Sequence, residues 1–231
     1  MTDTLARPDD LCAVLDGACA EEILALLNHP WVVAAAEDRL RDQQIGTWAG
    51  QDLAWGEWYG PVMQIAFVNA PRPARKAREW LDANMDRETG WFRDTAVRFG
   101  QAPGSDRIWI EFLGYGAWAQ LIARRDVEST PPGEPRIRAL TIARACEYAY
   151  HRVFSRIRDA NPAAGWARWA GAENWASPGF TEMISNLSRG LNLAAASAQV
   201  PVGELIEIAQ QTLLCERQCW TAVWELRGYL P

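Results

Sequence analysis

The chain has 231 residues, of which 49% are hydrophobic and 23% charged, values typical of a globular protein and not of a disordered one. Its 29 aspartates and glutamates outnumber 23 lysines and arginines, and the net charge of −6 argues against binding to nucleic acid or to anionic membrane surfaces. No apolar run is long enough to cross a bilayer, and the polar first ten residues lack the apolar core of a signal peptide. We therefore expect a cytoplasmic protein that binds neither nucleic acid nor membrane.

The first half of the chain is predicted to be helical after a loosely ordered segment at residues 1–17. Pro30 can open a helix at its first turn, the segment 69–73 with its two prolines breaks one, and Asp86 is a suitable N-cap. Apolar residues recur at spacings of three and four, which predicts helices at 18–27, 31–44, 46–68, 74–85 and 86–99.

The second half continues the helical pattern. Loops are predicted at 100–106 and at 126–135, where three prolines gather, and the tryptophan-rich stretch 161–178 is less regular. Ser177 followed by Pro178 indicates a helix start. The helices themselves are predicted at 107–125, 136–158, 180–197 and 204–227. No stretch alternates apolar and polar residues as a strand does, so the fold is predicted to be all-α, with residues 1–231 in one domain.

The cysteines and histidines indicate reduced thiols and no metal centre. The cysteine count is odd, no Cys-x-x-Cys pair is present, and only His29 and His151 could add imidazole ligands. We therefore expect no metal centre. The five cysteines are Cys12, Cys19, Cys146, Cys215 and Cys219.

One thiol has a promising neighbour on its own helix. Cys146 and Tyr150 are four residues apart, so they lie on the same helical face and pair a potential nucleophile with a phenol. Taken alone, a free cysteine on a helix is more often a small buried hydrophobe. The thirteen tryptophans also allow a pocket for a flat or cationic guest, although many of them fill space between helices.

Short motifs along the chain occur in an order that resembles the TenA family. They run from residue 29 to residue 220, and each is weak singly, but the ordered set is specific. In chain order they are His29-Pro30, Gln51-Asp52-x-x-Trp55, Gly114-Tyr115-x-x-Trp118, Cys146-x-x-x-Tyr150, Asn161-Pro162, Trp175-x-Ser177-Pro178-x-Phe180 and Glu216-x-x-Cys219-Trp220.

The resemblance implies a heme-oxygenase-like helical fold and the activity of thiaminase II or aminopyrimidine aminohydrolase. Such an enzyme is a cofactor-free hydrolase of thiamin salvage that acts on an aminopyrimidine or thiamin-type compound, and it commonly forms a homo-oligomer, a dimer or tetramer. Carried over by position, Cys146 is the nucleophile, Glu216 the acid/base and Asp52 the carboxylate that grips the ring. The remaining substrate-binding positions are Trp55, Tyr115, Trp118, Tyr150 and Trp175.

The chain departs from the family at the walls of the expected pocket. Tyrosine is usual in the family where this chain has Trp55, Trp118 and Trp175, and phenylalanine is usual at Cys219. An indole N–H donates but does not accept a hydrogen bond, so phenolic contacts to a polar ring are lost. Two alternatives therefore stay open: a diverged enzyme of secondary metabolism that takes a more apolar or cationic substrate, and a non-catalytic binding protein with a tryptophan-lined cavity.

Overall fold

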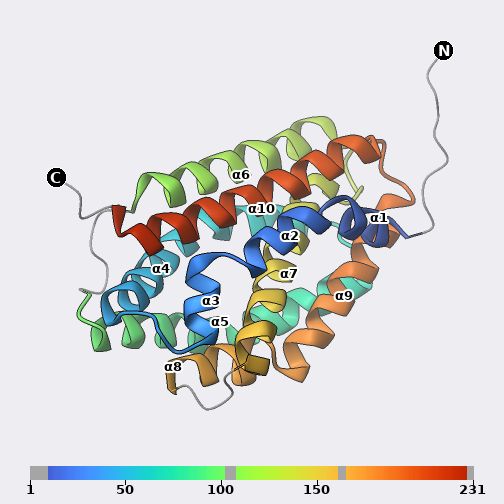
Figure 1. Cartoon of the computed structure of the whole chain (residues 1–231). Helices are drawn as coiled ribbons and strands as arrows, with labels where there is room; N and C mark the ends of the chain where they lie inside the picture. The colour runs from blue at the N-terminus through green and yellow to red at the C-terminus, as the bar shows by residue number, and fades with distance from the viewer. Residues whose placement is uncertain (1–9, 102–107, 161–164, 228–231) are drawn as a thin grey trace.

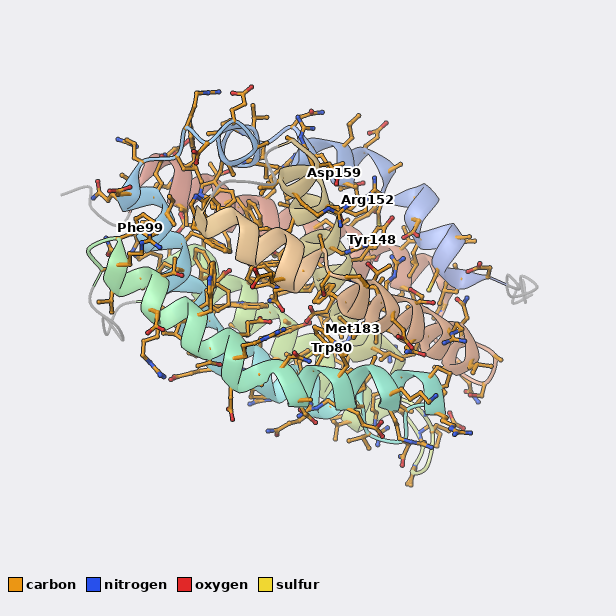
Figure 2. All side chains as sticks on the ribbon, turned by 90° about the horizontal axis from the view of Figure 1, so that it is seen from below. Trp80, Phe99, Tyr148, Arg152, Asp159 and Met183 are labelled. Carbon is orange, nitrogen blue, oxygen red and sulfur yellow. The ribbon has the colours of Figure 1, made fainter. Side chains whose placement is uncertain are left out.

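The computed structural model describes residues 10–101, 108–160 and 165–227, and within these ranges every regular element is a helix. The prediction of an all-α fold is confirmed (Figure 1). Three of the early elements are short, and the four longest helices are α4, α5, α7 and α10. The elements are α1 (Leu11–Ala18), α2 (Ala20–Leu27), α3 (Pro30–Ala36), α4 (Asp42–Ala66), α5 (Arg72–Arg98), α6 (Ile110–Ser129), α7 (Ile137–Ala160), α8 (Gly165–Arg168), the π-helix η1 (Trp169–Trp175), α9 (Pro178–Ala195) and α10 (Val202–Glu225).

Helix α7 runs through the middle of the bundle and packs against most of the other elements, including α4, α6, α9, α10 and η1. Figure 1 shows α6 and α10 side by side along one edge and α5 and α9 along the opposite edge. Most of the α7 side chains between Ile137 and Cys146 are buried, as expected for a helix surrounded on all sides. One continuous hydrophobic core joins the helices of the bundle.

The N-terminal segment is more ordered than predicted. Of the residues 1–17 expected to be loosely ordered, those from Leu11 onward form helix α1, while residues 1–9 lie outside the described ranges. The Asp10 side chain caps this helix and also accepts a hydrogen bond from Asn192 of α9 at 2.9 Å. Leu11 and Leu15 are buried in the common core. Burial against the rest of the protein thus stabilises helix α1, although its short sequence pattern did not predict a helix.

Several predicted boundaries in the first half move for local reasons. The single helix expected at 31–44 is instead divided, because α3 ends at Ala36 and Asp38 adopts a left-handed conformation with φ of 53°. Conversely, the two helices expected at 74–85 and 86–99 are one helix, α5. Asp86 is exposed in its middle and caps nothing.

The proline-rich loop predicted at 126–135 begins later than expected, because α6 continues to Ser129. Asp126 is fully buried in the last turns of α6, where its carboxylate accepts hydrogen bonds from the Arg138 guanidinium at 3.0 Å and the Ala139 amide at 2.9 Å. A buried carboxylate of this kind needs such partners. These two hydrogen bonds of Asp126 join α6 to the start of α7, the helix that carries Cys146.

The predicted start of α9 is confirmed, since the Ser177 hydroxyl accepts the Phe180 amide at 3.2 Å and Pro178 is the first helical residue. None of the helices that the structure describes is both long and apolar enough to cross a membrane.

Gly190 in α9 is a point of close helix contact, and we expect its replacement to destabilise the fold. A Cβ at this position would lie 2.5 Å from the Cβ of Ala74 and 2.6 Å from its backbone nitrogen on α5. Gly190→Ala is expected to lower the free energy of unfolding by about 1 to 3 kcal/mol through overpacking. Denaturant unfolding measures this change.

The matched control is Gly90→Ala, because Gly90 lies in α5 and a Cβ there would have no atom within 4 Å. That variant is expected to gain about 0.5 to 1 kcal/mol from the better helix propensity of alanine. Equal stability of the two variants would contradict the close contact between α5 and α9.

Candidate active site

A cavity of about 200 Å³ lies between α4, α5 and α7, and Trp175 of η1 forms part of its wall. Residues of α4 at spacings of three and four face it, as a helix face requires. Its rim includes the exposed Asp82 and Met85 of α5. The side chains used below are Asp52, Trp55 and Tyr59 from α4, Glu88 and Phe92 from α5, Cys146, Glu147 and Tyr150 from α7, and Trp175.

Cys146 forms the inner end of this cavity with a carboxylate directly behind it. Its thiol donates a hydrogen bond to Oε1 of Glu216 of α10 at 3.3 Å, and both residues are only 3% exposed. The other carboxylate oxygen of Glu216 accepts the Trp220 indole N–H at 3.3 Å. A nucleophile with a base in hydrogen-bond reach, itself oriented by a third group, has the geometry of covalent catalysis.

Burial sets the protonation states of this pair. Burial raises the pKa of the Cys146 thiol well above its ordinary value, and the nearby carboxylates of Glu216 and Glu147 raise it further. Burial also raises the pKa of Glu216 to about 7, although the hydrogen bonds from Cys146 and Trp220 oppose the rise. The resting thiol is therefore neutral, and Glu216 can accept or return a proton close to neutral pH.

Asp52 lies in the same cavity and is held by a phenol. The Tyr150 hydroxyl donates to Oδ2 of Asp52 at 2.5 Å. Burial raises the pKa of Asp52 well above its usual range, and the negative charge of Glu216 adds to the effect while the Tyr150 hydrogen bond opposes it. Tyr150 in turn meets the Trp175 ring edge-on at a centroid distance of 5.3 Å. Asp52 is thus a fixed carboxyl group that can hold or donate a proton toward a ligand.

The aromatic wall is a stack of three rings. Trp55 lies between Tyr59, at a centroid distance of 4.4 Å and 19° between planes, and Tyr115, at 4.9 Å and 25°. The indole nitrogen of Trp55 and the hydroxyls of Tyr59 and Tyr115 are buried and lack a hydrogen-bond partner among the described residues. Buried polar atoms of this kind are uncommon in proteins, and they mark positions where a ligand or water completes the bonding.

Most of the residues predicted for the site come together. Cys146, Asp52, Trp55, Tyr150 and Trp175 line the cavity. Two others stand behind its inner wall, in contact with those that line it: Glu216 beside the thiol and Tyr115 beneath Trp55.

Trp118 is the exception among the predicted site residues. It is half-buried on α6, its ring centroid is 6.4 Å from that of Tyr115, and it is not among the residues that line the cavity. The Cys219 position is buried next to Trp220, and it too does not line the cavity.

The motifs did not indicate three further lining residues, Tyr59, Glu88 and Glu147. Tyr59 follows Trp55 by four residues, so the helical spacing of α4 could have identified it. Glu147 follows the thiol directly. No pattern in the sequence indicated Glu88, because the helix predicted at 86–99 places it in a first turn. It lies instead in the interior of α5, where it accepts a hydrogen bond from Asn174 at 3.0 Å.

The helices define an all-α bundle built around a cavity with a buried thiol, carboxylates and an aromatic wall. No protein-family model matches the sequence, and no protein of curated function matches it either. The chain has the fold of the TenA proteins. A TenA homologue from Pyrococcus furiosus superposes with a TM-score of 0.78 at 15% identity, over 92% of this chain and 99% of that one.

Two further solved structures of this fold carry different descriptions. A protein described as TenA-like and assigned as a thiaminase by description alone, from Sulfolobus solfataricus, gives a TM-score of 0.72 at 14% identity, over 93% of this chain and 95% of that one. A protein from Silicibacter that is described as a TenA family transcription regulator gives a TM-score of 0.74 at 13% identity. The match covers 96% of this chain and 99% of that one. The expected fold is therefore confirmed across nearly the whole chain.

Proposed function

We propose that this chain is a diverged TenA-family hydrolase that uses Cys146 as nucleophile and Glu216 as acid/base on an aminopyrimidine or thiamin-type compound. The observation that carries the proposal is the hydrogen bond from the Cys146 thiol to Glu216 at the inner end of a cavity that Asp52 also lines. The order of motifs from residue 29 to residue 220 and the shared fold support it. No cofactor enters the proposed reaction.

The proposed chemistry follows from where the protons lie. As the Cys146 sulfur forms a bond to an electron-poor ring carbon, its proton passes to Glu216, so that no free thiolate is needed in the buried site. The electron pair that this addition places in the ring expels ammonia from an ammonium group, or neutral thiazole from a thiazolium group, on the neighbouring methylene carbon. Water then adds to that methylene carbon and releases a proton, while the sulfur leaves the ring carbon and takes its proton back from Glu216, which restores the thiol and the carboxylate. Asp52, held by Tyr150, grips a ring nitrogen and its adjacent amino group.

The stack around Trp55 favours a changed substrate within this reaction class. Its indole stands between Tyr59 and Tyr115, so Trp55 itself occupies one stacking position that a flat ring could use. Trp175 and residues of α5 line the same cavity. A diverged enzyme that acts on another aromatic compound is therefore the second candidate. A binding protein without chemistry would use the same cavity.

The test is turnover by the purified protein. We expect release of thiazole from thiamin, or of ammonia from 4-amino-5-aminomethyl-2-methylpyrimidine, in the absence of added metal. Quenching of tryptophan fluorescence by both compounds with no product from either would instead favour the binding protein. Under the proposed hydrolase, a cytoplasmic location, a role in thiamin salvage and a homo-oligomeric state all remain predictions.

A further inference from the structure

Besides the exposed Asp82 at its rim, the cavity is lined by two half-buried acidic side chains that the proposed hydrolysis does not use. Glu88 from α5 and Glu147 from α7 both line it, and both are half-buried. Within the part of the chain that the structure describes, no hydrogen bond or ion pair reaches the Glu147 carboxylate, and Glu88 accepts one hydrogen bond, from the Asn174 amide. The Asn174 amide is neutral, so it supplies a hydrogen bond to Glu88 but no positive charge to balance an ionised carboxylate.

Several carboxyl groups gather in this small volume. Asp52, Glu88 and Glu147 line the same cavity of about 200 Å³, and Glu216 stands behind it. Burial raises the pKa of Glu147 well above its ordinary value, and the neighbouring Glu88 and Glu216 raise it further. Carboxylates gathered in an apolar site are costly until a proton or a cation balances them.

The nearby arginines do not supply that balance. Arg78 lines the cavity, but its Nε donates to the exposed Asp82 at 2.6 Å. Arg87 lowers the pKa of Glu88, yet burial outweighs it and the pKa of Glu88 stays raised. Arg87 is exposed on α5 and is not among the lining residues. A cation that balances these carboxylates when they ionise would therefore come from a ligand.

An independent observation points to a ligand at the same place. Tyr59 lines the cavity and is only 8% exposed, and its hydroxyl is buried without a hydrogen-bond partner among the described residues. Tyr59, Trp55, Phe92 and Trp175 also surround the acidic groups with aromatic rings. Aromatic rings together with carboxylates form the usual cage for an organic ammonium group. A metal ion is a poorer fit, because no group of three or more His, Cys, Asp or Glu among the described residues is arranged to hold one.

We propose that Glu88 and Glu147 form a subsite for an ammonium or other organic cation on the substrate, in the aromatic cavity that leads to Cys146. The reacting ring would lie toward Cys146 and Asp52, and the positively charged group between α5 and α7. The placement of the ring rests on the proposed function, while the recognition of the cation stands on the cavity alone. The substrate is then an aromatic compound with a basic substituent or a cationic ring.

The experiment compares two probes of nearly equal shape, benzylammonium and benzyl alcohol, by quenching of tryptophan fluorescence in the full chain. We expect the wild-type protein to bind the cation at least about tenfold more tightly. Glu88→Gln and Glu147→Gln should each reduce this preference, and the double variant should reduce it to less than about twofold. Glutamine keeps the acceptor for Asn174, so the fold is retained, which circular dichroism and thermal unfolding verify.

Two further variants separate this proposal from the hydrolytic one. Glu182→Gln, an exposed carboxylate of α9, should leave the preference unchanged, and Cys146→Ser should also keep it. Equal binding of the two probes by the wild-type protein, or an unaltered preference in the double variant, would overturn the subsite. If no aminopyrimidine is turned over but the preference is present, the proposed hydrolysis fails and the cation subsite stands.

Discussion

Replacement of Cys146 by serine is expected to lower kcat by at least about a thousandfold, the scale seen when the nucleophile of a covalent mechanism is removed. The serine hydroxyl is a far weaker nucleophile at its ordinary pKa, and Glu216 is too weak a base to ionise it. KM should change little, because Asp52 and the aromatic wall remain in place. Initial rates of ammonia or thiazole release, measured over a range of substrate concentrations, separate the two constants.

The matched control is Cys12→Ser. Cys12 is also buried, its thiol donates to the Ser188 carbonyl at 3.4 Å, and it lies in α1, away from the cavity. A serine hydroxyl can make the same hydrogen bond, so this variant should fold and turn over substrate as the wild type does. Substantial turnover by Cys146→Ser would show that the sulfur forms no bond to substrate, and it would leave Glu216 and Asp52 to act on water.

The helices could be predicted because their signals are local. Apolar spacing indicated the bulk of α4, α6, α7, α9 and α10, and Ser177-Pro178 fixed the start of α9. The failures have a different origin. Helix α1 forms because Leu11 and Leu15 are buried against distant helices, and α5 passes through Asp86 because its packing against α4 and α9 outweighs a cap signal. Such tertiary effects leave little trace in a short window of sequence.

The site residues, like the helices, could be predicted where the signal was local and not where it depended on tertiary packing. Cys146, Asp52, Tyr150 and Trp175, which the motifs indicated, line one cavity. The first three lie on predicted helices, whereas Trp175 lies in the stretch that was predicted to be less regular. Trp118 shares a motif with Tyr115 but does not line the cavity, and of the two only Tyr115 stacks on Trp55. Glu88 could not be predicted at all. Its place in the cavity depends on how α5 packs against α4 and α9, which no local pattern specifies.

Glu216→Gln is expected to lower kcat/KM by about 100-fold to 10,000-fold and to change its dependence on pH. In the wild type, Glu216 must be ionised to take the thiol proton, and burial raises its pKa to about 7. The value of kcat/KM should therefore fall about tenfold per pH unit below 7 and reach a plateau above it. The Cys146 thiol adds no second step near neutrality, because its pKa is raised well above its ordinary value.

Asp52 and Glu147 also have raised pKa values in the same cavity, so the wild-type profile alone would not identify the titrating group. The variant does, because glutamine keeps the hydrogen bond from Cys146 but cannot accept its proton. Its remaining activity should show no acid limb near pH 7, whereas Glu207→Gln, exposed on the same helix, should show the wild-type profile. An acid limb that persists in Glu216→Gln would assign the proton transfer to one of the carboxylates lining the cavity, and Glu216 would then only position the thiol.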